Sequence, residues 1–473
     1  MGGINLNNIP TTCFVFDFRM PEGYLPFGYT KHTIGVNAIK KLNIIHESFT
    51  GYYPPLETPN DFRLNRTAGF QNYIVEQTPN TKYCLTTELK KSVDETELYL
   101  VVLESLNVNN LYEYYGSDKF DLSDFFSPQL TELIKNNKNF KIVFMDYREG
   151  AYPHNEYFLT KIDDFLNKHN INHKNKVIIS TNNNFINDTI NLKKYKHRIS
   201  VYCNNNYLLT AGKYISELRV ANNSITENDY EYSIQQNINY DLKEKYFLMY
   251  NRNSDRIHRS YFLNKLYKEN LIDKGYISFF ENPHFENFVN NSNQYPQLNL
   301  EYDDILDIKN NYKNYYPLVI DNTDGEKVAN FHNFLSRKDE YSNSYFTIVS
   351  ETNAESEYNF ITEKTIKPIM NLHPFVVLGN PHTLKVLKSF GFITFDKWWD
   401  ESYDNEFDFK KRTKMILSIV NDLCSKSQQE MNQLLYEMND VLTYNKNLLH
   451  KLSTSKEFEK QFFKILTKDI SIL

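Results

Sequence analysis

Three arginines stand just after an apolar run and at the start of a predicted helix. The run covers 246–251; Arg252, Arg256 and Arg259 follow it, and the helix is predicted over 257–271. Guanidinium groups bind phosphate oxygens in pairs, and the first turn of a helix carries a partial positive charge. The pattern therefore predicts a site for a phosphate or diphosphate. A solvated basic turn, with its arginines paired to nearby acids, is the alternative, and the spacing favours neither.

A second polar group lies where two apolar runs and a helix converge. Glu351 ends the run 345–351, and Thr362 can cap a helix that begins with Glu363 and Lys364. Glu363 is favourable in a first turn, whereas the Lys364 cation opposes the helix dipole and would gain from a bound anion. Glu351 could orient Lys364 or a ribose hydroxyl. The alternative is an ordinary capped helix between two strands.

Pro368 complicates this helix, because a proline beyond the first turn removes a helical hydrogen bond. Either the helix begins nearer Thr365, or it bends at Pro368. The sequence leaves both arrangements open.

Two carboxylates, Asp146 and Glu149, stand at the end of the apolar run 141–147. A carboxylate at the end of a strand could act as a general base. Arg148 lies between them, so an ordinary ion-paired loop is the alternative, and the spacing alone favours that alternative.

These polar groups share one position, the end of an apolar run. The runs are short, rich in β-branched and aromatic residues and not strictly alternating, as in strands buried on both faces. They are 98–105, 141–147, 176–181, 198–203, 246–251, 275–280, 316–321, 345–351, 374–379 and 391–395. Helical patterns lie between many of them, at 124–137, 155–168, 257–271, 327–336 and 381–389. This alternation predicts parallel α/β sheets, which bind ligands at the carboxyl ends of their strands.

The chain length predicts two domains. It has 473 residues, whereas a single core rarely grows beyond about 250–300 residues. A polar stretch at 211–245 separates the strands into two groups, so we place the boundary near 235, giving domains 1–235 and 236–473. From 406 onward the apolar residues recur at helical spacing, which predicts a helical C-terminal tail.

Charge and cysteine content limit the function classes. The chain has 53 Lys and Arg against 59 Asp and Glu, a net charge of −6, which does not favour extended nucleic-acid binding. Its four cysteines are scattered, so we expect neither a disulfide framework nor a structural zinc site. The N-terminus does not match a signal peptide, and no stretch is long and apolar enough for a membrane span, which predicts a cytoplasmic protein.

Several common motifs are missing from the sequence. It contains no Asp-x-Asp, which argues against a metal-dependent sugar transferase of the single-domain type. It also lacks GxGxxG, GxxxxGK[ST] and GxSxG, so the usual indications of dinucleotide oxidoreductases, P-loop NTPases and α/β-hydrolases are missing. His258 and His373 have no metal-ligand spacing and are predicted to be structural.

The stretch 345–381 resembles the α-1,3-fucosyltransferase family (glycosyltransferase family 10) and its viral and bacterial relatives. In that family a strand ends in Phe-Glu-Asn-Ser, a Tyr-Val-Thr-Glu-Lys segment begins a helix, and an apolar strand ends in Gly and Pro. Here Glu351-Thr-Asn353 stands for the first element, Phe360–Lys364 for the second and Phe375–Pro381 for the third. The arginine-rich turn is similar to the family's Asn/Arg segment that holds the donor diphosphate, with Arg259 as the closest match and Arg256 next.

The resemblance implies a GT-B glycosyltransferase, with two Rossmann-like domains facing across a cleft. Residues 1–235 would hold the acceptor, a glycan or glycoconjugate, and 236–473 a GDP- or UDP-linked sugar such as the fucose donor of the family. Transfer would be inverting and would need neither metal nor cofactor. The implied donor-binding residues are Arg252, Arg256, Arg259, Glu351, Asn353, Thr362, Glu363 and Lys364. Glu149, or failing it Asp146, would be the general base.

Two other readings stay open on sequence alone. A phage-type transferase that glycosylates DNA bases would share the donor domain but would need a basic groove in the first domain. A non-catalytic protein that binds nucleotides or glycans would keep the fold and lack the base. A viral protein of any of these kinds would act in the host cytoplasm.

Overall fold

The structure, a computed structural model, describes part of the chain and for some residues, Asp146 among them, the backbone alone. The described residues are 11–16, 82–86, 89, 93–104, 121, 123, 126–146, 156–173, 175–181, 198–203, 237–251, 256–279, 298–318, 320, 338–354, 359–454 and 466. The chain divides into two compact units: unit 1 comprises Met1–Asn206 and Lys456–Leu473, and unit 2 comprises Tyr207–Ser455.

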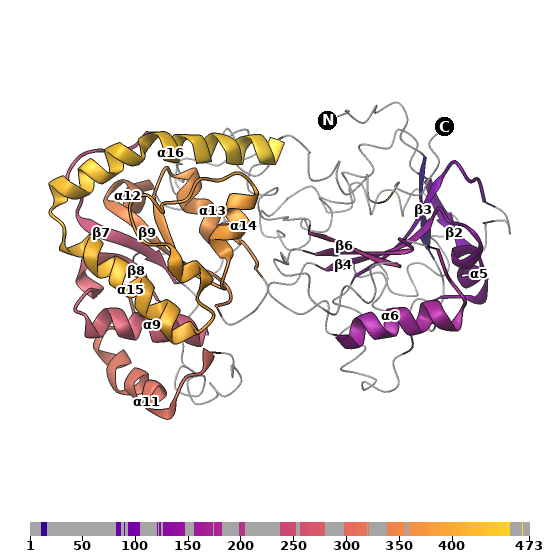
Figure 1. The fold of residues 1–473 in the computed structure, drawn as a ribbon, viewed down its shortest axis with the longest axis horizontal. Coiled ribbons are helices and arrows are strands. Elements are labelled where there is room, and N and C mark those ends of the chain that lie inside the picture. The colour runs from indigo at the N-terminus through magenta and orange to yellow at the C-terminus, as the bar shows by residue number, and fades with distance from the viewer. Residues whose placement is uncertain are drawn as a thin grey trace, which may run out of the picture. The chain divides into compact units, whose positions relative to one another are not determined.

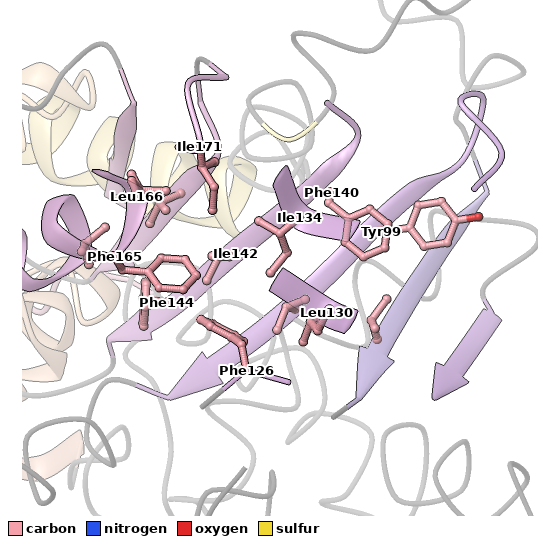
Figure 2. Close-up of a cluster of buried hydrophobic side chains, with 14 of the residues drawn as sticks. Tyr99, Phe126, Leu130, Ile134, Phe140, Ile142, Phe144, Phe165, Leu166 and Ile171 are labelled. Atoms are coloured by element: carbon pink, nitrogen blue, oxygen red, sulfur yellow. The ribbon is translucent and has the colours of Figure 1, made fainter. Parts of the chain in front are cut away.

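Unit 1 is built on a six-stranded sheet of order β2-β1-β3-β4-β5-β6, and every described pairing in it is parallel. Its strands are β1 (Thr12–Phe16), β2 (Lys82–Leu85), β3 (Leu98–Glu104), β4 (Phe140–Asp146), β5 (Val177–Thr181) and β6 (Ile199–Cys203). Helices α5 (Pro128–Asn136) and α6 (Glu156–Lys168) pack on it. The apolar faces of these helices and strands form one core, in which Tyr99 stacks on Phe140 (Figure 2).

Unit 2 has a four-stranded parallel sheet of order β10-β9-β7-β8. The strands are β7 (Lys245–Tyr250), β8 (Gly275–Ser278), β9 (Ser344–Ser350) and β10 (Phe375–Leu378). The helices are α9 (Ile257–Lys268), α11 (Tyr302–Asn311), α12 (Lys338–Ser342), α13 (Glu363–Met370), α14 (Thr383–Ser389), α15 (Phe409–Ser425) and α16 (Gln428–Thr454). In Figure 1, α16 lies above this sheet, and α9 and α15 lie below it.

The strand order of unit 2 reverses between β7 and β9. The chain adds β8 on one side of β7, then crosses to the other side to add β9 and β10. In open parallel sheets such a reversal separates the loops that follow the two strands and leaves a binding crevice at their carboxyl ends. In unit 2 the topology therefore points to the ends of β7 and β9.

The predicted fold class is confirmed at the level of two parallel α/β units with a helical C-terminal part. Eight of the ten predicted strands form, with ends shifted by one or two residues, and the structure adds β1 and β2, which the sequence did not predict. The helix predicted at 327–336 lies outside the described residues. The predicted domain boundary near 235 and the division after Asn206 both fall within 204–236, also outside them, so that boundary stays a prediction.

Two predicted strands are wrong, and their backbones show why. In 316–321 a single antiparallel bridge joins Leu318 to Phe279, and the preceding Pro317 has no N–H to extend a ladder. In 391–395 no neighbouring strand takes the backbone bonds among the described residues: Gly391 and Phe392 donate to carbonyls of α14, and Asn445 pairs with both polar groups of Ile393 at 2.9 and 2.7 Å. An apolar run becomes a strand only when a neighbouring strand satisfies its backbone.

Cys13 forms a disulfide bond, although the scattered cysteines predicted no disulfide framework. Sequence spacing reveals local cysteine pairs, whereas strand pairing brings distant segments together, and Cys13 lies in β1 between β2 and β3. Within the described part of the chain, no helix combines the length and the apolar composition needed to cross a bilayer.

Candidate functional site

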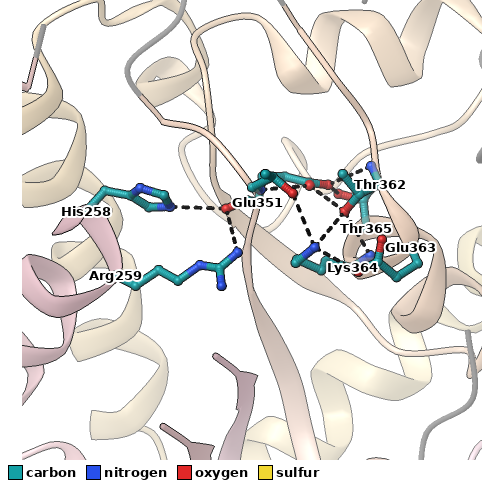
Figure 3. A network of polar contacts seen from close by, with 8 residues as sticks. His258, Arg259, Glu351, Thr362, Glu363, Lys364 and Thr365 are labelled. Atoms are coloured by element: carbon teal, nitrogen blue, oxygen red, sulfur yellow. Dashed lines mark hydrogen bonds and ion pairs between the residues drawn. The ribbon is translucent and has the colours of Figure 1, made fainter. Parts of the chain in front are cut away.

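Glu351 directly follows β9 and joins two helices through different parts of one residue. Its backbone carbonyl accepts hydrogen bonds from His258 Nε2 at 3.1 Å and from an Arg259 guanidinium nitrogen at 3.2 Å, both in the first turn of α9. Its carboxylate points the other way, to the start of α13 (Figure 3). The end of β9 is thus fixed between α9 and α13.

The Glu351 carboxylate closes the start of α13. It accepts hydrogen bonds from the backbone N–H of Thr362 at 3.2 Å, from the Thr362 hydroxyl at 2.6 Å and from the Thr365 hydroxyl at 2.5 Å. Burial raises the pKa of Glu351 above its usual range, although the Lys364 cation and the two hydroxyls pull it down. Glu351 is 2% exposed, so its carboxylate is an internal structural group in this structure.

Thr362 caps α13 as predicted, because its hydroxyl accepts the N–H of Lys364 at 3.2 Å. The helix begins at Glu363 and contains Pro368, so the alternative start near Thr365 is wrong. Two capping oxygens, from Thr362 and Glu351, stabilise the first turn and allow an eight-residue helix to tolerate a proline.

Lys364 lies beside the loop that follows β9. Its Nζ contacts Glu363 Oε1 at 2.7 Å and the hydroxyls of Thr352 and Thr362 at 3.3 Å each. Its side chain is 21% exposed. Burial raises the pKa of Glu363, but Lys364 and Lys367 outweigh this and leave that pKa below its ordinary value. The result is a partly exposed cation held in place by an ionised neighbour.

The first turn of α9 is cationic. Arg256 is the residue before the helix, and Arg259 follows three positions later, 3% exposed. Between them His258 is buried, and burial together with the Arg259 guanidinium holds the pKa of His258 well below its usual value. His258 is therefore neutral at ordinary pH, as expected for a structural histidine, while the positive charge at the helix start comes from the arginines.

A third arginine, which the sequence reasoning missed, holds the far end of the same loop. Arg412 is 1% exposed; it donates to the carbonyl of Ala354 and, at 2.7 and 3.2 Å, to those of Glu406 and Phe407. A signal was available: Arg412 falls in the apolar stripe of α15, between Phe409 and Ile416, where a charged residue is unusual. Arg259 and Arg412 together fix both ends of the loop 351–354.

Each strand of unit 2 is followed along the chain by a helix, and three of these helices begin against a carboxylate. Glu351 closes α13, and a capping box of Glu301 and Asp304 closes α11. Asp404 closes α14 by accepting the N–H groups of Leu384 and Lys385 at 2.8 and 3.0 Å.

The fourth helix, α9, begins differently. Within the described residues it has no side-chain cap and no acidic residue in its first turn. The carboxylates at the other three starts already interact with the partial positive charges there, which leaves α9 as the helix start best suited to an external anion. It is also the helix at the β7–β9 reversal.

The structure brings together five of the predicted donor-site residues: Arg259, Glu351, Thr362, Glu363 and Lys364 (Figure 3). Arg256 lies at the start of α9, and Asn353 is half-buried in the loop after β9. Arg252 and Glu149 lie outside the described residues. Asp146 ends β4 in unit 1, where the structure describes its backbone alone.

No protein-family model and no curated protein matches the sequence. Among solved structures, the chain is similar to a UDP-forming α,α-trehalose-phosphate synthase from Burkholderia xenovorans, with 8% identity, TM-score 0.37 and coverage of 98% of this chain and 99% of the other. A corresponding synthase from Burkholderia multivorans gives 11% identity, TM-score 0.34 and coverage of 86% and 74%. These likenesses are too remote to assign substrates or residues to this chain.

Proposed function

We propose that the protein is a glycosyltransferase that binds a nucleotide sugar in unit 2 and transfers the sugar to a hydroxyl of a glycan or glycoconjugate. One observation carries the proposal. At the β7–β9 reversal α9 begins with a cationic first turn that no side chain among the described residues caps, whereas α11, α13 and α14 begin against protein carboxylates. A nucleotide diphosphate is the common ligand of such an edge.

The positive groups around this edge suit a leaving diphosphate. Arg256 and Arg259 belong to the start of α9, and Lys364 Nζ contacts Thr352, the residue next to the Glu351 carbonyl that Arg259 binds. Arginine and lysine can stabilise the negative charge that develops when a glycosidic bond to a diphosphate breaks. We infer a metal-independent reaction, in which these side chains stabilise the leaving group.

The acceptor side and the base rest on the sequence. An inverting displacement needs one base that removes the acceptor proton as the hydroxyl attacks the anomeric carbon. Glu149 is our first candidate and Asp146 the second. If Glu149 is the base, Glu149→Gln lowers turnover strongly and leaves donor affinity unchanged; unchanged turnover would remove Glu149 from the mechanism.

The decisive experiment is a panel of GDP- and UDP-linked sugars, GDP-fucose included, read by thermal unfolding and by nucleotide release. A ligand at one hundred times its Kd stabilises the folded state by about 2.7 kcal/mol, a shift of roughly 5–10 °C for a unit of this size. We expect such a shift with one donor class and slow hydrolysis or transfer of its sugar.

The same panel separates the alternatives. A stabilising nucleotide without any release would indicate a binding protein instead of a transferase. No shift and no release with any donor would overturn the proposed function. Binding of duplex DNA that weakens steeply with salt would favour the DNA-modifying alternative.

A further inference from the structure

Two buried polar side chains at the β7–β9 reversal have no hydrogen-bond partner among the residues that the structure describes. Asn251, directly after β7, is 0% exposed, and neither its Nδ2 nor its Oδ1 has a partner. Its backbone N–H is satisfied by Ser278, through the carbonyl at 3.0 Å and the hydroxyl at 3.1 Å. Ser350, the last residue of β9, is 1% exposed, and its hydroxyl also has no partner.

These two residues are neighbours across the sheet. The register between β7 and β9 pairs Phe247 with Phe346 and Leu248 with Thr347. Continued to the ends of the strands, it places Asn251 opposite Ser350. Residues directly opposite each other in paired strands project to the same face. The tilted rings of Phe247 and Phe346, with centroids 5.9 Å apart, follow this rule.

The face is the one that α9 covers. On β9, Tyr345 contacts Gln428 at the start of α16, and Thr347 contacts His373, just after α13. Glu351, directly after β9, contacts the start of α13, so these residues define the opposite face. Ser350 alternates with them and projects toward α9. On β7, the centroid of the Tyr250 ring lies 5.6 Å from Lys367 Nζ of α13, so Tyr250 projects to that opposite face. Asn251, the next residue, therefore projects toward α9.

Buried polar atoms without partners are rare, since each loses its bonds to water on folding. Other buried polar atoms of unit 2 also lack a partner among the described residues, including the Thr413 hydroxyl. Asn251 and Ser350 differ because they lie on adjacent strands at the β7–β9 reversal, near the start of α9, where a group outside the chain could complete their hydrogen bonds. The helix start and the unpartnered side chains are independent observations, and they point to the same place.

The atoms specify the chemistry of the missing partner. The Asn251 amide offers donors on Nδ2 and an acceptor on Oδ1, and both sides are available, so the result does not depend on how the amide is oriented. Phosphoryl oxygens accept hydrogen bonds but do not donate them. A hydroxyl can donate to Oδ1. A group with both functions close together is a phosphorylated sugar.

We propose that Asn251 and Ser350 are ligand-binding residues, and that together they bind the phosphorylated sugar portion of a nucleotide at the start of α9. This rests on the proposed function and deepens it by assigning two contacts that the sequence did not predict. Nδ2 of Asn251 and the Ser350 hydroxyl donate to phosphoryl oxygens, and Oδ1 of Asn251 accepts from a sugar hydroxyl.

The test uses Ser350→Ala, with the ligand-free stability and the affinity measured separately. Tryptophan fluorescence reports unit 2, because Trp398 and Trp399 are the two tryptophans of the chain and both lie there. We expect the ligand-free variant to unfold at a temperature no lower than wild type, since a costly unpartnered hydroxyl is removed. We expect the affinity for GDP or UDP, whichever binds wild type, to fall about tenfold.

Thr413→Val is the matched control. The Thr413 hydroxyl is also buried and without a partner among the described residues, but it belongs to helix α15 and not to the end of a strand. Its removal should leave nucleotide affinity unchanged. Asn251→Asp is a second variant that removes the donor and places a carboxylate toward the phosphate, so binding of GDP, UDP and inorganic pyrophosphate should be lost.

Two results would overturn this inference and leave the proposed function standing. One is a Ser350→Ala variant that unfolds at a lower temperature and binds nucleotide as wild type does, which would indicate an internal water instead of a ligand. The other is an Asn251→Asp protein that is folded and binds nucleotide normally. If wild type binds no nucleotide at all, the proposed function fails as well.

Discussion

The Thr362 hydroxyl donates a 2.6 Å hydrogen bond to the Glu351 carboxylate, so the residue after β9 also closes the start of α13. The predicted contact of Glu351 with a ribose stays a prediction, but the geometry gives this carboxylate another use. The cations Lys364 and Arg259 lie on either side of Glu351: Lys364 contacts the Thr352 hydroxyl, and Arg259 contacts the Glu351 carbonyl. Their contact with a bound diphosphate is our proposal.

Glu351→Ala should destabilise unit 2 by roughly 3 kcal/mol, because it leaves two hydroxyls and one N–H without their acceptor in the interior. Glu351→Gln should cost less than half as much, since it keeps the volume and one acceptor. Urea unfolding followed by tryptophan fluorescence measures both values.

The stabilities of wild type and Glu351→Gln should also depend differently on pH. Burial raises the pKa of Glu351, so its stabilising contribution is complete below the ordinary carboxyl range and is lost as pH rises through the raised pKa. Glu351→Gln cannot ionise. The stability difference between wild type and the Gln variant should therefore narrow as pH rises, and a widening gap would contradict the internal role.

Acid should destabilise unit 2 through two neutral histidines. Burial lowers the pKa of His258 well below its usual value and that of His373 to about 3. The unfolded chain takes up these protons near pH 6.5, so stability falls below that pH by about 1.4 kcal/mol per pH unit for each histidine. For His373 the loss continues down to about pH 3.

The variant His258→Gln isolates one of the two, since glutamine can still donate to the Glu351 carbonyl. Between pH 6.5 and 5.5, the free energy of unfolding of this variant should fall by about 1 kcal/mol less than that of wild type. Unfolding curves at both pH values measure this difference. Parallel losses in the two proteins would mean that His258 is protonated in the folded state.

Asp404→Ala should lower the stability of unit 2 by about 1–2 kcal/mol, the usual cost of losing a helix cap, because Leu384 and Lys385 lose their acceptor. Nucleotide affinity should stay within about twofold of wild type, since the start of α14 is not our proposed anion site. Calorimetric titration with GDP and UDP checks this. A tenfold weaker affinity would move the ligand toward α14.

The local part of this site was readable from sequence, and the non-local part was not. Thr362 followed by Glu363 is a helix-start pattern within a few residues, and the structure confirms it in spite of Pro368. The cap of α14 comes from Asp404, twenty positions beyond Leu384, and no local sequence pattern predicts it. Asn251 and Ser350 become neighbours only through the strand register.

The errors in the fold have the same origin. Apolar content predicted a strand at 391–395, but the Asn445 and Glu401 side chains bind the backbone of Ile393 and Phe395. The sequence predicts where a chain can be buried, whereas the partner of each backbone group depends on segments far away.

Lys364→Met should weaken nucleotide binding at least tenfold while changing stability little. Its Nζ lies 2.7 Å from Glu363, but the lysine is partly exposed, and ion pairs of that kind contribute about 0–1 kcal/mol. We expect the Lys364 cation to contribute more to the affinity for a diphosphate, because it is already held beside the loop after β9.

Lys388→Met is the matched control: that lysine also pairs with carboxylates, Asp396 at 2.8 Å and Glu401 at 3.3 Å, elsewhere in unit 2. Titration at two salt concentrations should show a weaker salt dependence for Lys364→Met than for wild type or the control. Equal affinities in the two variants would show that Lys364 does not contact the ligand.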